Sequence, residues 1–151
     1  MKRTIWGIAL LALLAGLGIA AHFALGPGAG DEAASGAGQG KKTSTEPLEL
    51  TDANFSSVTA SGVVLVDFWS VRCPPCRAQG PIVDGLAKNF AGRATIGKLN
   101  VDENPRTARE FNIMYIPTLI ILRDGEVVKR FTGLQQEEVL ASALKGALAG
   151  T

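Results

Sequence analysis

The sequence has only two cysteines, one histidine and one tyrosine, and charge of neither sign is in excess. The formal net charge is +1, and residues 47–151 carry as many Lys and Arg as Asp and Glu residues. This balance gives no indication of a nucleic-acid-binding surface. The histidine, His22, lies in an apolar leader, so it is a poor candidate to complete a metal site with the cysteines.

By composition the 151 residues divide into three parts. Residues 1–25 form an apolar leader, residues 26–46 a Gly-rich stretch, and residues 47–151 a segment long enough for one domain of ordinary size. The stretch 26–46 is small and polar without apolar periodicity, so it cannot bury enough surface to offset the entropy of ordering. We predict a flexible linker there.

The leader predicts a membrane anchor. Residues 4–25 contain no charged side chain and follow Lys2 and Arg3. A secretory signal has an apolar region of ~7–15 residues, whereas this run of about 22 residues can cross a ~30 Å hydrocarbon core as a helix. The positive pair predicts a cytoplasmic N-terminus, with the remaining chain outside. No strict Ala-x-Ala motif follows, so we favour an uncleaved anchor, with a cleaved signal peptide and a secreted domain as the alternative.

Hydrophobic periodicity predicts the order strand, helix, strand, helix, strand, helix, strand, strand, helix in the domain. The helix that starts at the cysteines should end at Gly92, and Thr51 or Asp52 could cap a short helical turn. In the final helix the predicted apolar stripe is Leu140, Leu144 and Leu148, with Val139 and Ala143 beside it. The expected strands cover residues 48–50, 63–66, 95–101 and 118–122, and a helix covers 105–111.

Asp124-Gly125 between two apolar runs predicts a β-hairpin, so the last two strands should be antiparallel. Strands alternating with helices come before it and imply parallel pairs. The sequence therefore predicts an α/β fold with a central mixed sheet flanked by helices.

The two cysteines, Cys73 and Cys76, stand three apart directly after a predicted strand and at the start of a predicted helix. Pro74 and Pro75 between them suit the first helical turn. A cysteine at a helix N-terminus lies near unpaired N–H groups that stabilise a thiolate, and a second cysteine one turn later can resolve a mixed disulfide. Spacing and context therefore favour redox chemistry.

Three other interpretations of the pair stay open. A structural disulfide would close a loop of about four residues and contribute roughly 2 kcal/mol, against ~4.7 for a 100-residue loop. A zinc or copper site would need more soft or imidazole ligands than the domain offers. Two inert core thiols are conceivable, although the Pro-Pro spacer and the helix start suit exposure better than burial.

Three sequence segments, in the order in which they occur in thioredoxins, resemble that family, and the resemblance covers nearly all of residues 48–148. VDFWSVRCPPCR at residues 66–77 is similar to the family's active-site segment, KLNVD at 98–102 to its central strand, and IPT at 116–118 to its cis-proline loop. The resemblance implies the thioredoxin fold and thiol-disulfide oxidoreductase activity, with no cofactor beyond a redox-active Cys73–Cys76 disulfide and no metal.

The resemblance also implies residue roles. Cys73 would be the nucleophile, Cys76 the resolving thiol, and Asp67 the buried carboxylate that exchanges a proton with Cys76. A carboxylate on an otherwise apolar strand is costly unless it is paired or useful. The other implied roles belong to Lys98 as charge partner of Asp67, Trp69 as a shield of the pair, Pro81 as a helix kink, Ile116-Pro117 as a cis peptide that binds an extended substrate, and Gly133 in the substrate groove.

Two positions depart from the family pattern. Arg72 stands where thioredoxins usually have tryptophan, and we hypothesise that it favours the Cys73 thiolate and acidic partner surfaces. Pro74 replaces the usual glycine, which removes an N–H near the thiolate and stiffens the turn. These departures leave partner choice and redox poise open.

Leader and cysteine pair together predict an envelope disulfide reductase, periplasmic if the source is a Gram-negative bacterium. Its expected partners are proteins with disulfides or thiols and a membrane electron donor, and preparing apocytochrome c thiols for haem attachment is one plausible task. The alternatives are a disulfide-introducing oxidase or isomerase, against which the lack of a histidine between the cysteines argues mildly, and a noncatalytic peptide-binding module of the same fold.

Overall fold

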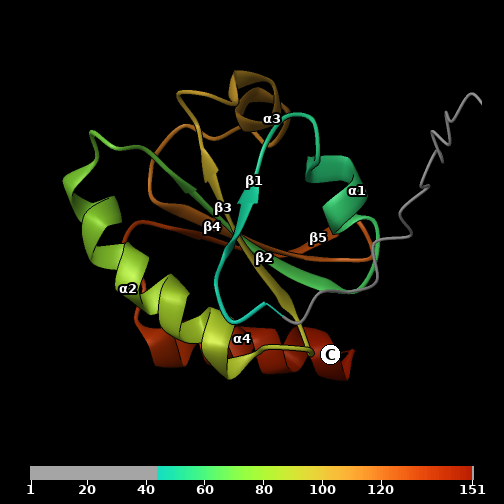
Figure 1. Ribbon diagram of the computed structural model, residues 1–151. Helices are drawn as coiled ribbons and strands as arrows, with labels where there is room; N and C mark the ends of the chain where they lie inside the picture. The colour runs from blue at the N-terminus through green and yellow to red at the C-terminus, as the bar shows by residue number, and fades with distance from the viewer. Residues whose placement is uncertain (1–43, 151) are drawn as a thin grey trace, which may run out of the picture. The chain divides into compact units, whose positions relative to one another are not determined.

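The computed structural model describes residues 44–150 (Figure 1). Five strands form one sheet in the order β1-β3-β2-β4-β5, with β2 parallel to β3 and antiparallel to β4. The predicted element order and mixed α/β sheet are confirmed. The elements are β1 (Leu48–Leu50), α1 (Phe55–Thr59), β2 (Val63–Trp69), α2 (Pro74–Asn89), β3 (Thr95–Asn100), α3 (Pro105–Glu110), β4 (Thr118–Arg123), β5 (Glu126–Thr132) and α4 (Glu137–Ala149).

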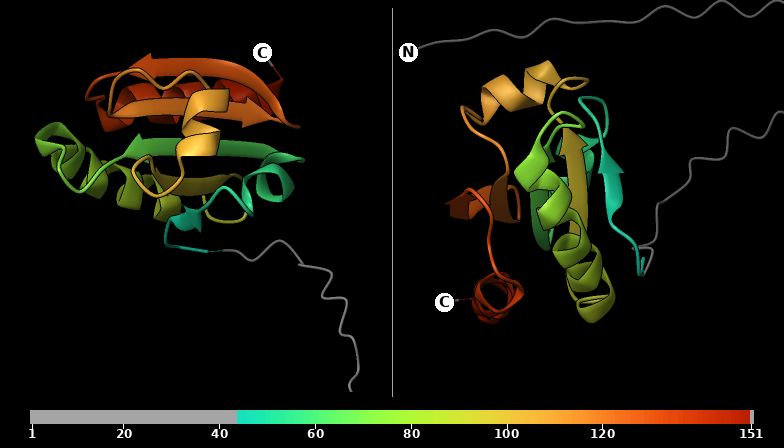
Figure 2. Two further views of the ribbon diagram at one scale, coloured as in Figure 1. Left: turned by 90° about the horizontal axis from the view of Figure 1, so that it is seen from above. Right: turned by 90° about the vertical axis from the view of Figure 1, so that its left-hand side faces the viewer.

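The central strand β2 is buried on both faces because successive side chains point to opposite sides of a sheet. Val63 and Leu65 pack against α2 and α4, which lie together on one face (Figures 1 and 2). Val64 and Phe68 join the opposite core with Phe55 of α1. The same alternation places Asp67 on the face that α2 covers.

The hairpin between β4 and β5 forms at the predicted turn. Asp124 and Gly125 both have positive φ, 51° and 85°. Two successive residues with positive φ give the turn twist that matches paired strands, and Asp and Gly tolerate it best. The Asp124 carboxylate also accepts a hydrogen bond from the Gly62 N–H at 2.8 Å, which ties the turn to the start of β2.

Of the two predicted caps of the first helical turn, Thr51 is confirmed and Asp52 is not. The Thr51 hydroxyl accepts from the Asn54 N–H at 3.3 Å at the turn that leads into α1, and Asn54, the N-cap of α1 itself, makes no side-chain cap bond. Asp52 instead accepts hydrogen bonds at the start of α3, from the Arg106 N–H at 3.2 Å and the Thr107 N–H at 2.8 Å. The tertiary fold brings the start of α3 within reach of this carboxylate, and unpaired N–H groups at a helix start attract such a partner.

The predicted apolar stripe of α4 is partly wrong. Leu140 and Leu144 are fully buried, but Leu148 is 38% exposed and Val139 is 45% exposed, while Ala147 is buried. Because 3.6 residues make a turn, a second step of four residues rotates Leu148 away from the sheet, and a step of three from Leu144 brings Ala147 onto it.

Within residues 44–150 no helix has the length and apolar content needed to span a membrane. The predicted anchor at residues 4–25 and most of the predicted linker lie outside the described residues.

Candidate active site

Cys73 and Cys76 form a disulfide at the start of α2, with Cα atoms 5.3 Å apart. Cys73 is the N-cap of the helix, and its Sγ accepts a hydrogen bond from the Cys76 N–H at 3.2 Å. Pro74 and Pro75 occupy the first helical positions, where a missing N–H costs nothing. The helix start therefore offers an N–H donor to the sulfur of Cys73, as stabilisation of a thiolate requires.

Contrary to the sequence expectation, both cysteines are buried in the disulfide form. Cys73 is 7% exposed and Cys76 is 4% exposed, whereas Arg72, Pro74 and Pro75 are exposed. Closing the disulfide places each sulfur against the other and against the helix start, which removes both from water.

The loop before β4 holds the predicted cis peptide, Ile116-Pro117. β4 begins at Thr118, which pairs with Phe68 near the end of β2, so this loop and the cysteine segment emerge at the same end of the sheet. Gly133 donates its N–H to the Pro117 carbonyl at 2.8 Å, with φ at +84°. Gly133 therefore lies beside the cis-proline, where the resemblance expects the substrate groove.

Three large apolar side chains near this end of the sheet are exposed, and none of them was predicted from the sequence to be a site residue. Val71 is 60%, Met114 80% and Tyr115 74% exposed. Met114 and Tyr115 precede Ile116-Pro117 in a segment without helical or strand periodicity. Large apolar residues in such a loop could have indicated a binding surface from the sequence, because exposed apolar side chains often mark such surfaces.

Asp67 is 1% exposed, and its Oδ1 has no hydrogen-bond partner. Burial raises the pKa of this carboxyl from 3.8 to about 7, opposed by the positive charge of Lys98 and assisted by the negative charge of Asp84. A buried carboxyl that titrates near neutrality can both accept and donate a proton at physiological pH. The predicted buried position of Asp67 is confirmed.

Lys98 lies beside Asp67 in the register of β2 and β3, but its ammonium binds elsewhere. Its Nζ lies 2.6 Å from the Asp84 Oδ1 of α2. Lys98 does act on Asp67 as a charge, since it lowers the pKa of that carboxyl, but its ion pair is with Asp84, which no sequence pattern indicated.

Arg72 is held by a neighbouring carboxylate. Its guanidinium lies 3.2 Å from the Asp102 Oδ1, and its side chain is 81% exposed. The other oxygen of Asp102 accepts a 2.6 Å hydrogen bond from the Ser70 hydroxyl. The hydrogen bond from Ser70, joined by that from Arg72, lowers the pKa of Asp102, so the carboxylate stays ionised. Arg72 thus stands next to Cys73 in a restrained orientation.

Trp69 ends β2 half-buried, and its carbonyl accepts from the Val101 N–H at 2.9 Å. Gln79 of α2, which no sequence pattern indicated as a site residue, is buried and exchanges hydrogen bonds with the backbone of Gln135. Its Oε1 accepts at 2.8 Å and its Nε2 donates at 3.4 Å. Gln79 thereby joins the cysteine helix to the loop that contains Gly133.

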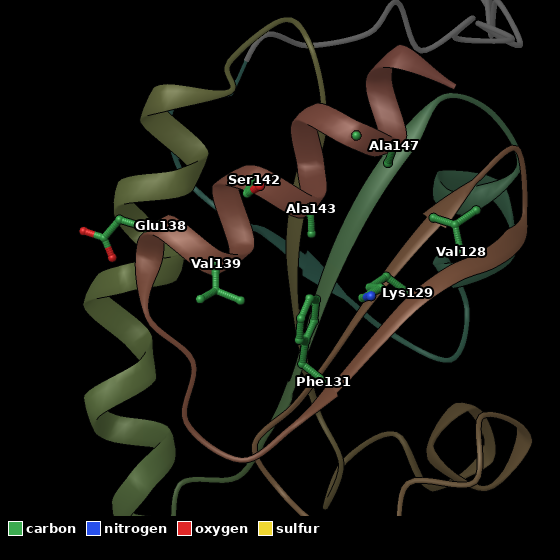
Figure 3. Close-up of a pocket in the computed structure, with 9 residues that line it drawn as sticks. Val128, Lys129, Phe131, Glu138, Val139, Ser142, Ala143 and Ala147 are labelled. Atoms are coloured by element: carbon green, nitrogen blue, oxygen red, sulfur yellow. The ribbon is translucent and has the colours of Figure 1, made fainter. Parts of the chain in front are cut away.

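A groove of about 610 Å³ lies between β5 and α4, lined by Val128, Phe131, Val139 and Ala143 among others (Figure 3). Neither cysteine nor the cis-proline lines it, so it is separate from the disulfide site. Residues 44–150 contain no cluster of three or more His, Cys, Asp or Glu side chains suited to a metal ion.

A disulfide between cysteines three apart at a helix start, with a cis-proline loop at the same end of a mixed sheet, defines a thiol-disulfide oxidoreductase site. The thioredoxin family model matches residues 46–146. A thioredoxin of Staphylococcus aureus is 47% identical over 97 residues, covering 64% of this chain and 93% of that protein. A thioredoxin of Staphylococcus haemolyticus is 48% identical with the same coverage.

Among solved structures, a mutant thioredoxin from Halobacterium salinarum NRC-1 has a TM-score of 0.66 and 33% identity, covering 72% of this chain and 96% of that one. The chain belongs to the thioredoxin family. It is a thioredoxin-type protein-disulfide oxidoreductase with Cys73 and Cys76 as its redox pair.

Proposed function

We propose that this protein reduces disulfides in extracytoplasmic proteins while anchored to the membrane by residues 4–25. The observation that supports the chemistry best is the Cys73–Cys76 pair at the start of α2, close in sequence to a buried carboxyl that titrates near neutrality. The apolar leader with its positive flank supports the location. A Gly-rich tether would raise the concentration of the site near membrane partners.

In the first step the Cys73 thiolate attacks one sulfur of a partner disulfide. A mixed disulfide forms, and the partner's second sulfur leaves as a thiolate. Cys76 then gives its proton to Asp67 and attacks the Cys73 sulfur, so that the Cys73–Cys76 bond forms and the partner's first sulfur leaves. Two electrons pass from the dithiol to the partner disulfide, and both released thiolates take protons from water. A membrane electron donor would restore the dithiol.

Insulin-disulfide reduction by the purified protein, with dithiothreitol as the reductant that restores the Cys73–Cys76 dithiol in each cycle, tests this chemistry. We expect turnover that is lost in Cys73→Ser and in Cys76→Ser. Ser142 lies in the groove between β5 and α4, away from the disulfide, so Ser142→Ala serves as the control and should keep full turnover. Retained turnover in Cys73→Ser would contradict the catalytic assignment. Retained peptide binding and in vivo function in that variant would support a noncatalytic module instead.

The reduction potential tests the direction of electron flow. A reductase should have a reduction potential of about −270 mV, whereas that of a disulfide-introducing oxidant or isomerase is about −120 to −180 mV. Equilibration of the Cys73–Cys76 pair with glutathione or a dithiol of known potential gives the value. A potential in the second range would refute the reductase assignment.

The substrate can be identified by trapping. In Cys76→Ala the mixed disulfide cannot be resolved by the second thiol, so partner proteins should stay linked to Cys73 in the native host. Apocytochrome c among them would support a task in cytochrome c maturation, and a broad set would support general repair. Reaction of the reduced cysteines with a membrane-impermeant maleimide in intact spheroplasts tests the location, because a cytoplasmic domain would remain unlabelled.

Arg72 is our candidate for tuning Cys73 and partner choice. Its positive charge beside the helix start should favour the thiolate, although Asp102 neutralises part of that charge. Arg72→Trp should therefore raise the pKa of the Cys73 thiol, measured by thiolate absorbance in the reduced protein. An unchanged or lower value would contradict the assignment, and Asp102→Asn should shift the value in the opposite direction.

A further inference from the structure

One face of α2 carries Cys76, Gly80 and Asp84, each four residues after the last. Residues at this spacing lie above one another on a helix. The Lys98 ammonium lies along this face: it is 2.6 Å from the Asp84 carboxylate, and a Cβ placed on Gly80 would be 3.9 Å from it. That distance is an ordinary van der Waals contact, so the ammonium lies beside Gly80, the residue between the resolving cysteine and Asp84 on this face.

Asp67 lies on the same face of the sheet as Lys98, one strand away in register. Its Oδ1 is buried without a hydrogen-bond donor. A buried carboxylate next to a lysine would normally gain from an ion pair, since an uncompensated buried charge costs several kcal/mol. In this structure Lys98 instead binds Asp84, whose carboxylate is more exposed than that of Asp67. The Asp84 side chain is 49% exposed and the Lys98 side chain 27%.

We propose that Asp84 is a positioning residue: by binding the Lys98 ammonium it keeps that charge from pairing with Asp67, and so sets the pH at which Asp67 changes its protonation state. For catalysis this inference rests on the proposed proton transfer between Cys76 and Asp67. Asp84 does not touch the sulfur atoms and acts through Lys98.

The charges that act on Asp67 come from two elements. On β3 the group is Lys98, and on α2 it is Asp84, with the Cys76 thiol appearing on the same helix once the disulfide is reduced. On the other side, β4 contributes Leu119, the strand partner of Asp67, which carries no charge. In accord with the geometry, Lys98 lowers and Asp84 raises the pKa of Asp67, while burial dominates. Asp84 therefore opposes the one cation that acts on Asp67 among the described residues.

The test is a carbon-13 NMR titration of the Asp67 carboxyl in the oxidised full chain in detergent. Its signal is identified by its loss in Asp67→Asn. We expect the midpoint to move to lower pH in Asp84→Asn, by about half a pH unit or more, because the freed ammonium can approach Asp67. Lys98→Gln should move it to higher pH. Glu138→Gln removes one exposed carboxylate from α4 and should leave the midpoint unchanged.

A double variant separates action through the lysine from direct repulsion between the two carboxylates. Without Lys98, only the direct effect of Asp84 remains, so adding Asp84→Asn to Lys98→Gln should shift the midpoint less than it does in the natural chain. An Asp84→Asn midpoint equal to that of Glu138→Gln, or an equal shift with and without Lys98, would overturn the proposal.

Turnover then tests the proposed function separately. The pH dependence of insulin-disulfide reduction should move in Asp84→Asn in the same direction as the Asp67 midpoint. If the NMR midpoint moves and the rate profile does not, the Asp84–Lys98 coupling stands and the proton transfer from Cys76 to Asp67 is refuted.

Discussion

Replacement of Asp67 by asparagine should stabilise the protein at high pH and have little effect at low pH. The carboxyl has a folded-state pKa of about 7 against 3.8 in its ordinary environment, mainly because it is buried. Between these pH values the unfolded chain has lost the proton while the folded protein keeps it. The unfolded state then binds fewer protons, so the free energy of unfolding falls as pH rises through this window.

The size of the effect follows from the two pKa values. A difference of about 3 pH units at about 1.4 kcal/mol per unit gives about 4 kcal/mol. This cost is absent below about pH 4, where both states are protonated, and complete above about pH 7. The asparagine side chain has nearly the same shape as the protonated acid and no charge, so Asp67→Asn avoids the cost at every pH.

Urea unfolding of the oxidised protein at pH 4 and pH 8 measures the effect. The free energy of unfolding of Asp67→Asn should match that of the natural chain at pH 4 and exceed it by about 4 kcal/mol at pH 8. Glu138→Gln, at an exposed site, should show no such pH-dependent difference. The same difference at both pH values would refute the reasoning, because it would show that Asp67 does not change its protonation state in this range.

Leu144→Ala should lower the free energy of unfolding by about 2–5 kcal/mol because the side chain is fully buried, whereas Leu148→Ala in the same helix should cost less than about 1 kcal/mol. Equal losses of unfolding free energy, measured in urea, would contradict the observed buried face of α4. Gln79→Met leaves the Gln135 N–H without its partner, so it should lower the free energy of unfolding by about 1–3 kcal/mol. In insulin reduction it should raise KM more than it lowers kcat. An unchanged KM would show that Gln79 does not act on substrate binding through the loop that contains Gly133. Asp52→Asn should lower the free energy of unfolding at pH 7. This loss of stability should shrink below about pH 4, because protonation of Asp52 then removes the stabilisation from its lowered pKa in the natural chain as well. A loss independent of pH would contradict the role of the Asp52 carboxylate at the start of α3.

Most of the fold could be predicted from local patterns. Alternating and helical apolar spacing located every strand and helix of the described domain to within a few residues, and Asp124-Gly125 located the hairpin. The error in α4 arose because a short apolar pattern on a helix fits two different spacings. The stripe Leu140, Leu144 and Leu148 fits a spacing of four, but over two turns the true period selects Ala147 instead.

The cysteines show the same limit for the site. Their spacing and the helix start predict a redox pair, and the structure shows the disulfide. Their burial could not be predicted, because the exposed fraction of a side chain depends on the atoms that the fold places around it. The cis-proline loop was located by its resemblance to thioredoxins, whereas the exposure of Met114 and Tyr115 emerged only from the structure.

By itself, the sequence determined the thioredoxin family, the redox pair and the presence of an acidic residue on a buried strand, since these depend on residue type and short spacing. Only the tertiary structure decided which charges meet. Lys98 binds Asp84, which is 14 residues away in the chain, and Arg72 binds Asp102, which is 30 residues away. Long flexible side chains choose among all carboxylates within reach, and that choice is made by the packing of α2 and the strand ends rather than by any local pattern.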